Sequence, residues 1–284
     1  MELYGGAGHS KVILNNLSKN GLLIGIDRDE EALKAAKQNL KEYNNVKYVH
    51  GNHDDIGKIL EDIGIEKVDG ILLDLGVSSY QLDEKSRGFS YIGENELDMR
   101  MDKTQDLTAK DVVNNYSEED LSKIIFEYGE ERFSRNIAKN ICIEREKKQI
   151  QTTSELVQII EKSIPKSKQK DGHPAKRTFQ AIRIEVNNEL EELEQALKVC
   201  LELLNVDGRL CVISFHSLED RIVKNIFKEV SEIDPFLKGL PNIDKNLLPD
   251  YEIITNKPIL PSEDEINYNK RSKSAKLRII KRIK

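Results

Sequence analysis

Short apolar runs alternate with amphipathic stretches along much of the chain. Residues 22–27, 46–49 and 68–75 are rich in Ile, Leu and Val, as buried strands are. Between the first two runs, apolar side chains recur at helical spacing over residues 29–43, which predicts an amphipathic helix. This alternation of strand and helix predicts a parallel sheet that is covered by helices on both faces.

The strand pattern returns near the carboxyl end of the chain. Residues 209–215 predict a further buried strand, and residues 251–255 and 276–283 predict two strands joined by a long polar loop. We expect these last two strands to form a closing antiparallel pair. A long helix over about residues 176–204 is predicted to return the chain to the sheet.

Only helical periodicity occurs between about residues 107 and 170. Four helices are predicted there, at residues 109–114, 118–128, 131–147 and 153–163, with Ser117 and Thr153 as N-caps. We therefore predict an α/β domain formed by residues 1–106 and 171–284, with an all-helical subdomain of residues 107–170 inserted into it. Ligands of open α/β sheets bind at the carboxyl ends of the strands, so an insertion at that edge would overhang them.

The composition limits the classes of protein that fit. The chain has 284 residues, of which 33% are charged, and a net charge of −6. No run approaches the roughly 20 apolar residues of a membrane span, and no signal peptide opens the sequence. Cys142, Cys200 and Cys211 match neither a zinc pattern nor a disulfide framework. We expect a cytoplasmic protein with reduced cysteines and no metal site.

A basic segment lies at the end of this acidic sequence. Residues 270–284 hold eight Lys and Arg residues and no Asp or Glu. Such a segment suits the phosphate backbone of a nucleic acid. A final strand with solvated Lys and Arg side chains on its outer face fits the pattern equally well, and the sequence leaves both interpretations open.

The first residues of the sequence indicate a nucleotide-type cofactor. Gly5, Gly6 and Gly8 form a turn before a predicted helix, where backbone N–H groups can approach a ligand closely. Asp27 ends the next predicted strand, where a carboxylate can accept hydrogen bonds from ribose hydroxyls. The dinucleotide fingerprint has a third glycine where this chain has Lys11, so the pattern favours S-adenosylmethionine over NAD.

Polar groups follow other predicted strands. Asp74 ends a buried strand and is followed by small residues that include Ser78 and Ser79. His216 follows the next strand and offers an imidazole at the same edge. Arg177 lies near the start of the long helix, where a cation is unfavourable to the helix dipole. It therefore needs another partner, either a substrate phosphate or an internal carboxylate.

Four motifs resemble those of the bacterial 16S ribosomal RNA cytosine-N4 methyltransferases, in the same order and over essentially the whole chain. They begin at Gly5 (GGAGHS), Asp74 (DLGVSS), Arg177 (RTFQAIRIEVN) and Ser214 (SFHSLEDR). The resemblance implies a Rossmann-like class I sheet that binds S-adenosylmethionine. It also implies methylation of the exocyclic N4 amine of one cytidine in the decoding region of the small ribosomal subunit.

The resemblance extends to single residues. The implied cofactor contacts are Ala7, Gly8, His9, Asp27, His53, Asp74 and Gln81, although the family more often has an aromatic residue at the position of His53. The predicted contacts to substrate RNA are Arg177, Arg183, Arg271 and Lys273. We expect 16S ribosomal RNA, within the small ribosomal subunit, as the partner. The helical insertion could serve either RNA recognition or a homodimer interface.

Members of this family usually have a further segment before the glycine turn, including a central strand. Here only four residues, Met1 to Tyr4, precede Gly5. We expect residues upstream of this sequence and, without them, weak folding or weak cofactor affinity. The reason is that a central strand supplies ladder hydrogen bonds and one flank of the cofactor cleft.

The predicted chemistry is transfer to an amine. Methylation of a cytosine ring carbon typically needs a Cys nucleophile, and no Cys here follows a predicted strand end. The N4 amine can attack a sulfonium methyl group itself once an acceptor orients it and takes a proton. Asp74 is the first candidate for this acceptor, although the resemblance also assigns it to the cofactor. The backbone of Ser78 and Ser79 could supply the acceptor instead, and His216 is the alternative general base.

Three other functions fit parts of the sequence. A DNA amine methyltransferase shares the chemistry but usually has Asp/Asn/Ser-Pro-Pro-Tyr/Phe where this chain has DLGV from Asp74. A NAD-dependent oxidoreductase fits the fold but not Lys11. A non-catalytic ribosome-assembly factor that binds S-adenosylmethionine would keep Asp27 and the basic segment, and only turnover distinguishes it from the enzyme.

Overall fold

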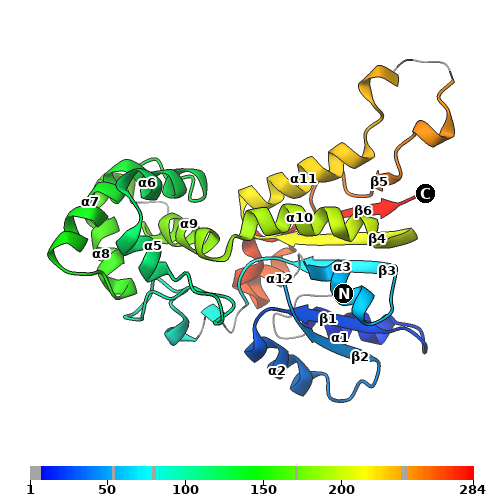
Figure 1. The fold of residues 1–284 in the computed structure, drawn as a ribbon, viewed down its shortest axis with the longest axis horizontal. Helices are drawn as coiled ribbons and strands as arrows, with labels where there is room; N and C mark the ends of the chain where they lie inside the picture. Colours follow the sequence, from blue (N-terminus) through cyan, green and yellow to red (C-terminus); the bar gives the residue numbers. More distant parts are fainter. Residues whose placement is uncertain are drawn as a thin grey trace. The chain divides into compact units, whose positions relative to one another are not determined.

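The chain folds into two compact units (Figure 1). The computed structural model describes residues 8–52, 55–78, 81–82, 84–169, 172–237, 239 and 242–284. One unit, here called the sheet unit, comprises Met1–Gly76 and Leu190–Lys284, and the other, the helical unit, comprises Val77–Glu189. Among the described residues, no helix is both long and apolar enough to span a membrane.

Helices alternate with strands through the sheet unit, as the apolar runs predict. Its regular elements are α1 (Gly8–Asn16), β1 (Leu23–Asp27), α2 (Glu30–Asn39), β2 (Val46–His50), α3 (Ile56–Asp62), β3 (Val68–Asp74), α10 (Glu189–Glu202), β4 (Leu204–Ser214), α11 (Ser217–Ser231), β5 (Tyr251–Ile253), α12 (Glu263–Tyr268) and β6 (Lys276–Arg282). Short 3₁₀ helices are η4 (Pro235–Leu237), η5 (Lys245–Leu247) and η6 (Lys270–Ser274).

The described strands form two sheets. β1 and β2 pair in parallel, and the larger sheet has the order β3-β4-β6-β5. Within the larger sheet β3 and β4 are parallel, whereas β6 is antiparallel to both β4 and β5. The predicted parallel pairing of the strands is thus confirmed within each sheet, and so is the predicted antiparallel pair near the end of the chain.

One edge of the larger sheet collects the ends of its two parallel strands. Asp74, the last residue of β3, pairs with Ile213. Ser214, the last residue of β4, pairs with Lys276, the first residue of β6. Groups that follow β3 and β4 therefore lie at the same edge as groups that precede β6, and this edge positions the candidate site.

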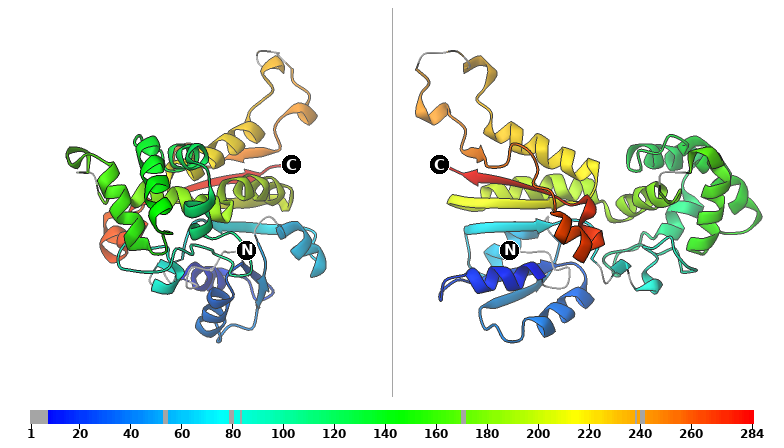
Figure 2. Two further views of the ribbon diagram at one scale, coloured as in Figure 1. Left: turned by 60° about the vertical axis from the view of Figure 1, so that its left-hand side comes forward. Right: turned by 180° about the vertical axis from the view of Figure 1, so that it is seen from behind.

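An apolar cluster joins the larger sheet to its helices. Helices α10 and α11 lie alongside β4 in both figures of the fold (Figures 1 and 2). The cluster includes Ile71 and Leu73 of β3, Leu210 and Val212 of β4, Leu60 of α3, Leu197 of α10 and Phe227 of α11. Burial of these side chains fixes the strands and so the positions of the residues that follow them.

The helical unit is built on a separate apolar core. Its regular elements are η2 (Lys85–Arg87), α5 (Ala109–Asn115), α6 (Glu118–Glu127), α7 (Ser134–Lys147), α8 (Thr153–Ser163), η3 (Lys166–Lys168) and α9 (Lys176–Asn187). The unit is larger than the predicted insertion of residues 107–170. The reason is its core, which also includes Leu97, Met99 and Met101 before that range and Phe179 and Ile182 after it.

The single helix predicted over residues 176–204 is wrong, because the chain breaks it into α9 and α10. Asn188 adopts a left-handed backbone conformation with φ of 47°, which Asn tolerates better than most residues. The Asn187 side chain donates to the carbonyls of Met99 and Arg183 and accepts a hydrogen bond from the Met101 N–H. These bonds hold the end of α9 within the helical unit.

One of the two predicted helix caps is confirmed and the other is wrong. Ser117 caps α6 and accepts a hydrogen bond from the Asp120 N–H. Thr152, rather than Thr153, caps α8, in a capping box with Glu155. The Thr153 hydroxyl instead donates to the Gly93 carbonyl and accepts from the Asn95 N–H. Tertiary contacts therefore decided between two adjacent threonines that are equally suited to capping.

Candidate functional site

The carboxylate of Asp74 and the imidazole of His9 come together in the sheet unit. His9 lies in the first turn of α1, and its Nδ1 is 3.5 Å from Asp74 Oδ2 at the end of β3. Gly5, Gly6 and Ala7 lie outside the described residues, so the glycine turn itself is not part of this geometry. His9 and Asp74, two cofactor contacts that the family resemblance implies, are thus neighbours in the structure.

The second oxygen of Asp74 is a buried acceptor. Oδ1 is shielded from solvent and has no hydrogen-bond partner among the residues that the structure describes. A buried carboxylate oxygen without a partner is costly, because burial removes the water that would otherwise bind it. A bound molecule that presents an N–H or O–H group would satisfy this oxygen.

Two glycines lie near these residues: Gly8 at the start of α1, and Gly76 two residues after Asp74. A Cβ added at Gly8 meets nothing within 4 Å among the described atoms. Gly76 has φ of +84°, and a Cβ there would lie 3.7 Å from the Phe215 ring. The positive φ explains the glycine after β3, since L side chains disfavour that conformation. Gly8 begins α1, and the first turn of a helix is where backbone N–H groups can bind a ligand.

Asp27 lies at the end of β1, as predicted. Its Oδ1 accepts a hydrogen bond of 2.8 Å from the Asp29 N–H, and Asp29 in turn caps α2. Beside it, Arg28 forms an ion pair of 3.1 Å with Glu192 of α10. The turn that follows Asp27 is therefore held by these hydrogen bonds and by this ion pair, which gives the carboxylate a fixed position at the strand end.

Three further residues were predicted to contact the cofactor, and none of them belongs to the part of the sheet unit that the structure describes. Ala7 and His53 lie outside the described residues. Gln81 belongs to the helical unit, where it is buried. Its Oε1 accepts from the Ser78 N–H at 2.9 Å, and its own N–H donates to Ser78 Oγ at 3.1 Å. These bonds stabilise the turn after Gly76, and a cofactor role for Gln81 stays a prediction.

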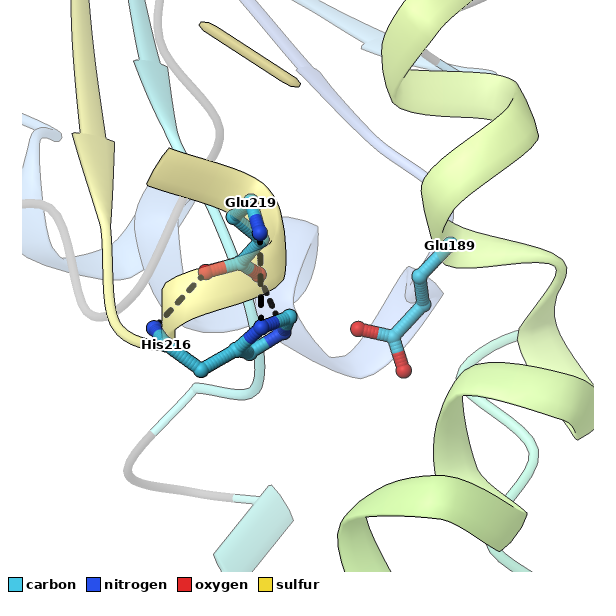
Figure 3. A group of neighbouring side chains, drawn as sticks. All are labelled: Glu189, His216 and Glu219. Atoms are coloured by element: carbon cyan, nitrogen blue, oxygen red, sulfur yellow. Dashed lines mark hydrogen bonds and ion pairs between the residues drawn. The ribbon is translucent and has the colours of Figure 1, made fainter. Parts of the chain in front are cut away.

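His216 is the N-cap of α11 (Figure 3). Its Nδ1 accepts a hydrogen bond of 3.4 Å from the Glu219 N–H, and its Nε2 is 3.1 Å from Glu219 Oε1. The buried Glu219 carboxylate also accepts from the N–H groups of Phe215 and His216. A general base needs a free lone pair, and the cap occupies the one on Nδ1. His216 Nε2, like Asp74 Oδ1, is buried without a hydrogen-bond partner among the described residues, so the choice between Asp74 and His216 as the base stays a prediction.

The two predicted RNA contacts of the helical unit differ in their surroundings. Arg177 is exposed, and its Nη1 donates to the Glu130 carbonyl at 3.0 Å. Its protein partner is therefore a backbone oxygen and not the internal carboxylate that was one of the two alternatives. Arg183 is mostly buried and donates two hydrogen bonds of 2.8 Å to Glu189. Such a bidentate pair commits Arg183 to the fold.

Asp220 joins two cations of the basic segment to α11. Its carboxylate accepts from Arg278 Nε at 2.7 Å and from Lys276 Nζ at 3.2 Å. Burial raises the pKa of Asp220, but the hydrogen bonds and charges of Arg278 and Lys276 outweigh it and hold that pKa below its usual range. The motif that begins at Ser214 includes Asp220, but the sequence alone does not indicate its partners.

The rest of the basic segment divides at the start of β6. Lys281 is 2.6 Å from Asp207, whereas Arg282 and Lys284 donate to backbone carbonyls. The cations of β6 and Lys284 therefore bind the rest of the sheet unit, and phosphate binding stays a prediction for the residues that precede β6. Three exposed cations precede β6, and they are Lys270, Arg271 and Lys273 of η6.

The sequence is similar to those of known proteins over nearly its whole length. The sequence profile described as the MraW methylase family matches residues 3–283. A protein named ribosomal RNA small subunit methyltransferase H from Clostridium botulinum (strain 657 / Type Ba4) is 56% identical over 279 residues, which are 98% of this chain and 90% of that protein.

Proteins of the same name from two other organisms are similar to the same extent. That of Clostridioides difficile (strain 630) is 53% identical over 281 residues, 98% of this chain and 90% of the relative. That of Caldicellulosiruptor bescii is 56% identical over 281 residues, which are 99% of this chain and 91% of the relative. Among solved structures, an rRNA methylase from Streptococcus thermophilus matches 100% of this chain and 86% of its own, with a TM-score of 0.42 and 11% identity.

Proposed function

This chain belongs to the MraW methylase family, and we propose that it methylates the N4 amine of one cytidine in the decoding region of 16S ribosomal RNA. It is a methyltransferase with an α/β class I fold, and its methyl donor is S-adenosylmethionine. The observation that carries the proposal is the Asp74 carboxylate, which has one buried oxygen without a partner and the other beside His9.

The residues of the sheet unit fit this cofactor. Asp74 Oδ1 needs a hydrogen-bond donor, and S-adenosylmethionine carries amino and hydroxyl groups that can donate. Gly8, His9, Asp27 and Asp74 would hold it, with Asp27 on the ribose hydroxyls. When bound, the cofactor supplies a methyl group on a positively charged sulfur. Roles for Ala7, His53 and Gln81 remain part of the proposal.

Asp74 is proposed to act on the amine of the target base. The lone pair of the N4 amine is delocalised into the cytosine ring, which makes the amine a weak nucleophile. By accepting a hydrogen bond from the amine, Asp74 orients it and takes a proton as the N–C bond forms and the C–S bond breaks. His216 is the less favoured base, because its Nδ1 already accepts the Glu219 N–H.

The proposed substrate is 16S ribosomal RNA within the small ribosomal subunit, with the target base turned out of its stack. Arg177, Arg271 and Lys273 are exposed cations that suit phosphate contacts, whereas the pairing of Arg183 with Glu189 argues for a structural role there. We propose that the helical unit serves RNA recognition rather than dimer formation, because Arg177 belongs to it. We also propose that the protein is cytoplasmic, because ribosomal subunits are found in the cytoplasm.

Methyl transfer to small ribosomal subunits that lack the modification tests the function. Subunits are incubated with the protein and labelled S-adenosylmethionine, and the digested nucleosides are identified by mass spectrometry. We expect N4-methylcytidine. Label in a different nucleoside would contradict the proposed target. In a parallel reaction with DNA, N4-methyl-2′-deoxycytidine without any label in the subunits would favour a DNA amine methyltransferase instead.

A further inference from the structure

A fully exposed tyrosine lies at the edge of the sheet that carries Asp74. Tyr268 is the last residue of α12, and 95% of its surface is accessible to solvent. Nothing in the packing of the sheet unit explains an aromatic residue there. Single exposed apolar residues are common, so exposure alone does not mark a site. The surroundings of Tyr268 provide the further evidence.

The chain on both sides of Tyr268 is held by local hydrogen bonds. Ser262 caps α12 and accepts from the Glu265 N–H. Asn269 Oδ1 accepts from the Arg271 N–H at 3.1 Å, and the buried Ser272 donates from Oγ to the Asn269 carbonyl at 2.8 Å. Tyr268 is therefore displayed from a backbone that these bonds order, which lowers the entropy cost of binding through it.

Strand pairing places this segment at the functional edge of the larger sheet. Ile259 bridges Leu277, so the chain before α12 runs back along β6 toward its start. The chain after η6 enters β6 at Lys276, opposite Ser214. Because Ser214 and Asp74 end neighbouring parallel strands, α12 and η6 lie at the edge where β3 and β4 end (Figure 1).

Cations follow Tyr268 directly. Lys270, Arg271 and Lys273 are exposed in η6. The acidic residues of the segment, Glu263, Asp264 and Glu265, lie three to five residues before Tyr268, in the first turn of α12. An aromatic side chain beside exposed cations is the combination with which proteins bind single-stranded nucleic acid: the ring stacks on a base and the cations contact phosphates.

We propose that Tyr268 stacks on an unpaired base of the RNA substrate near the methylated cytidine, with Arg271 and Lys273 on the adjoining phosphates. This inference rests on the proposed function, because it takes RNA as the substrate. Tyr268 does not touch the reacting atoms in this proposal. It positions the strand from which the target base is turned out.

Fluorescence of a single-stranded RNA that contains 2-aminopurine tests the stacking. We expect quenching on binding to the full chain, and about a tenfold loss of affinity for Tyr268→Ala, within the range for stacking on one base. Tyr268→Trp should retain both the quenching and the affinity. In the methylation assay Tyr268→Ala should raise KM for ribosomal subunits about tenfold and leave kcat nearly unchanged.

Phe236 provides a matched control in the sheet unit. It is 93% exposed, lies in η4 between α11 and β5, and belongs to the loop at the opposite edge of the sheet. Phe236→Ala should leave RNA affinity and KM unchanged. Arg271→Ala and Lys273→Ala should each lower the salt dependence of binding by about 0.7 in the log–log slope.

The outcomes separate this inference from the proposed function. Unchanged affinity and KM in Tyr268→Ala, or an equal loss in Phe236→Ala, would overturn the stacking role even if the protein makes N4-methylcytidine. Failure of the unaltered protein to bind the RNA would overturn it as well. Binding and quenching without formation of N4-methylcytidine would contradict the proposed function and leave the stacking role standing.

Discussion

His9 Nδ1 lies 3.5 Å from Asp74 Oδ2, which joins the first turn of α1 to the end of β3. The two residues are far apart in the sequence and belong to different motifs. Their meeting leaves Asp74 Oδ1 as the oxygen that is buried without a partner among the described residues. Both proposed roles of Asp74, cofactor binding and base chemistry, would use the acceptor capacity that Oδ1 leaves unused.

Replacing Asp74 by asparagine separates these two roles. The amide of Asp74→Asn would keep an acceptor oxygen but lose the charge and the basicity, so we expect kcat to fall about 100-fold, the lower end for loss of a general base. Cofactor affinity, measured by calorimetry, should change less than about threefold, because one hydrogen bond is kept. Asp69→Asn, on the same strand and exposed, is the control and should have no effect on kcat. A collapse of cofactor affinity would show instead that Asp74 holds the cofactor.

Changes at His216 should affect stability rather than catalysis. His216→Ala removes the N-cap of α11 and should lower the free energy of unfolding by about 1 kcal/mol. His216→Asn restores a good capping residue and should recover most of that loss in urea denaturation. We expect kcat of both folded variants to stay within a few-fold of the unaltered protein. A large fall in kcat for the well-folded His216→Asn variant would argue that His216 is the base.

Glu155 makes the stability of α8 depend on pH. Hydrogen bonds from Lys148 and from the backbone N–H groups of Gln151 and Thr152 lower the pKa of Glu155 from 4.5 to about 2. Because the folded-state pKa is depressed, this stabilisation is present above about pH 4.5 and is lost as the pH falls toward 2. The site is partly exposed, so we expect only about 1 kcal/mol at pH 7.

Urea unfolding of Glu155→Gln at two pH values measures this contribution. The difference from the unaltered protein should be near 1 kcal/mol at pH 7 and should shrink by about half or more near pH 3. Glu161→Gln, on the exposed face of the same helix, is the control. A loss in Glu155→Gln that is equal at both pH values would mean that its charge does not stabilise the cap.

Gly88 should tolerate no side chain. It has φ of +69°, and an added Cβ would lie 2.2 Å from the Glu96 carbonyl oxygen and 2.9 Å from the Asp98 nitrogen. Both atoms are backbone, so Gly88→Ala should destabilise the helical unit by about 3 kcal/mol or more. Gly172→Ala is the comparison, because Gly172 also has a positive φ but an added Cβ would meet nothing within 4 Å among the described residues.

Thermal unfolding of these two variants separates the clash from the backbone strain. Gly172→Ala should cost only about 1 kcal/mol, the usual penalty for an L side chain in that conformation. Similar melting temperatures for the two variants would mean that the chain around Glu96 moves aside easily.

The sequence by itself determined the elements whose signal is local. Buried strands such as β3 are apolar runs of the right length, and the order of apolar and polar positions was enough to place six strands and most helices. The candidate residues Asp27, Asp74 and His216 were predictable as well, since each follows a recognisable strand. The helix cap at Ser117 was also predictable from the sequence, because a cap depends on its nearest neighbours in the chain.

Only the tertiary structure decided features that depend on partners distant along the chain. The extent of the helical unit follows from residues such as Met99 and Phe179 packing into its core, and the helix break at Asn188 accompanies the bonds that Asn187 makes to residues 99 and 101. The pairing of Arg278 with Asp220, 58 residues before it, turns a potential phosphate ligand into an internal ion pair. A charged side chain has the same local sequence signal whether it meets a carboxylate or solvent, and folding alone brings the carboxylate to it.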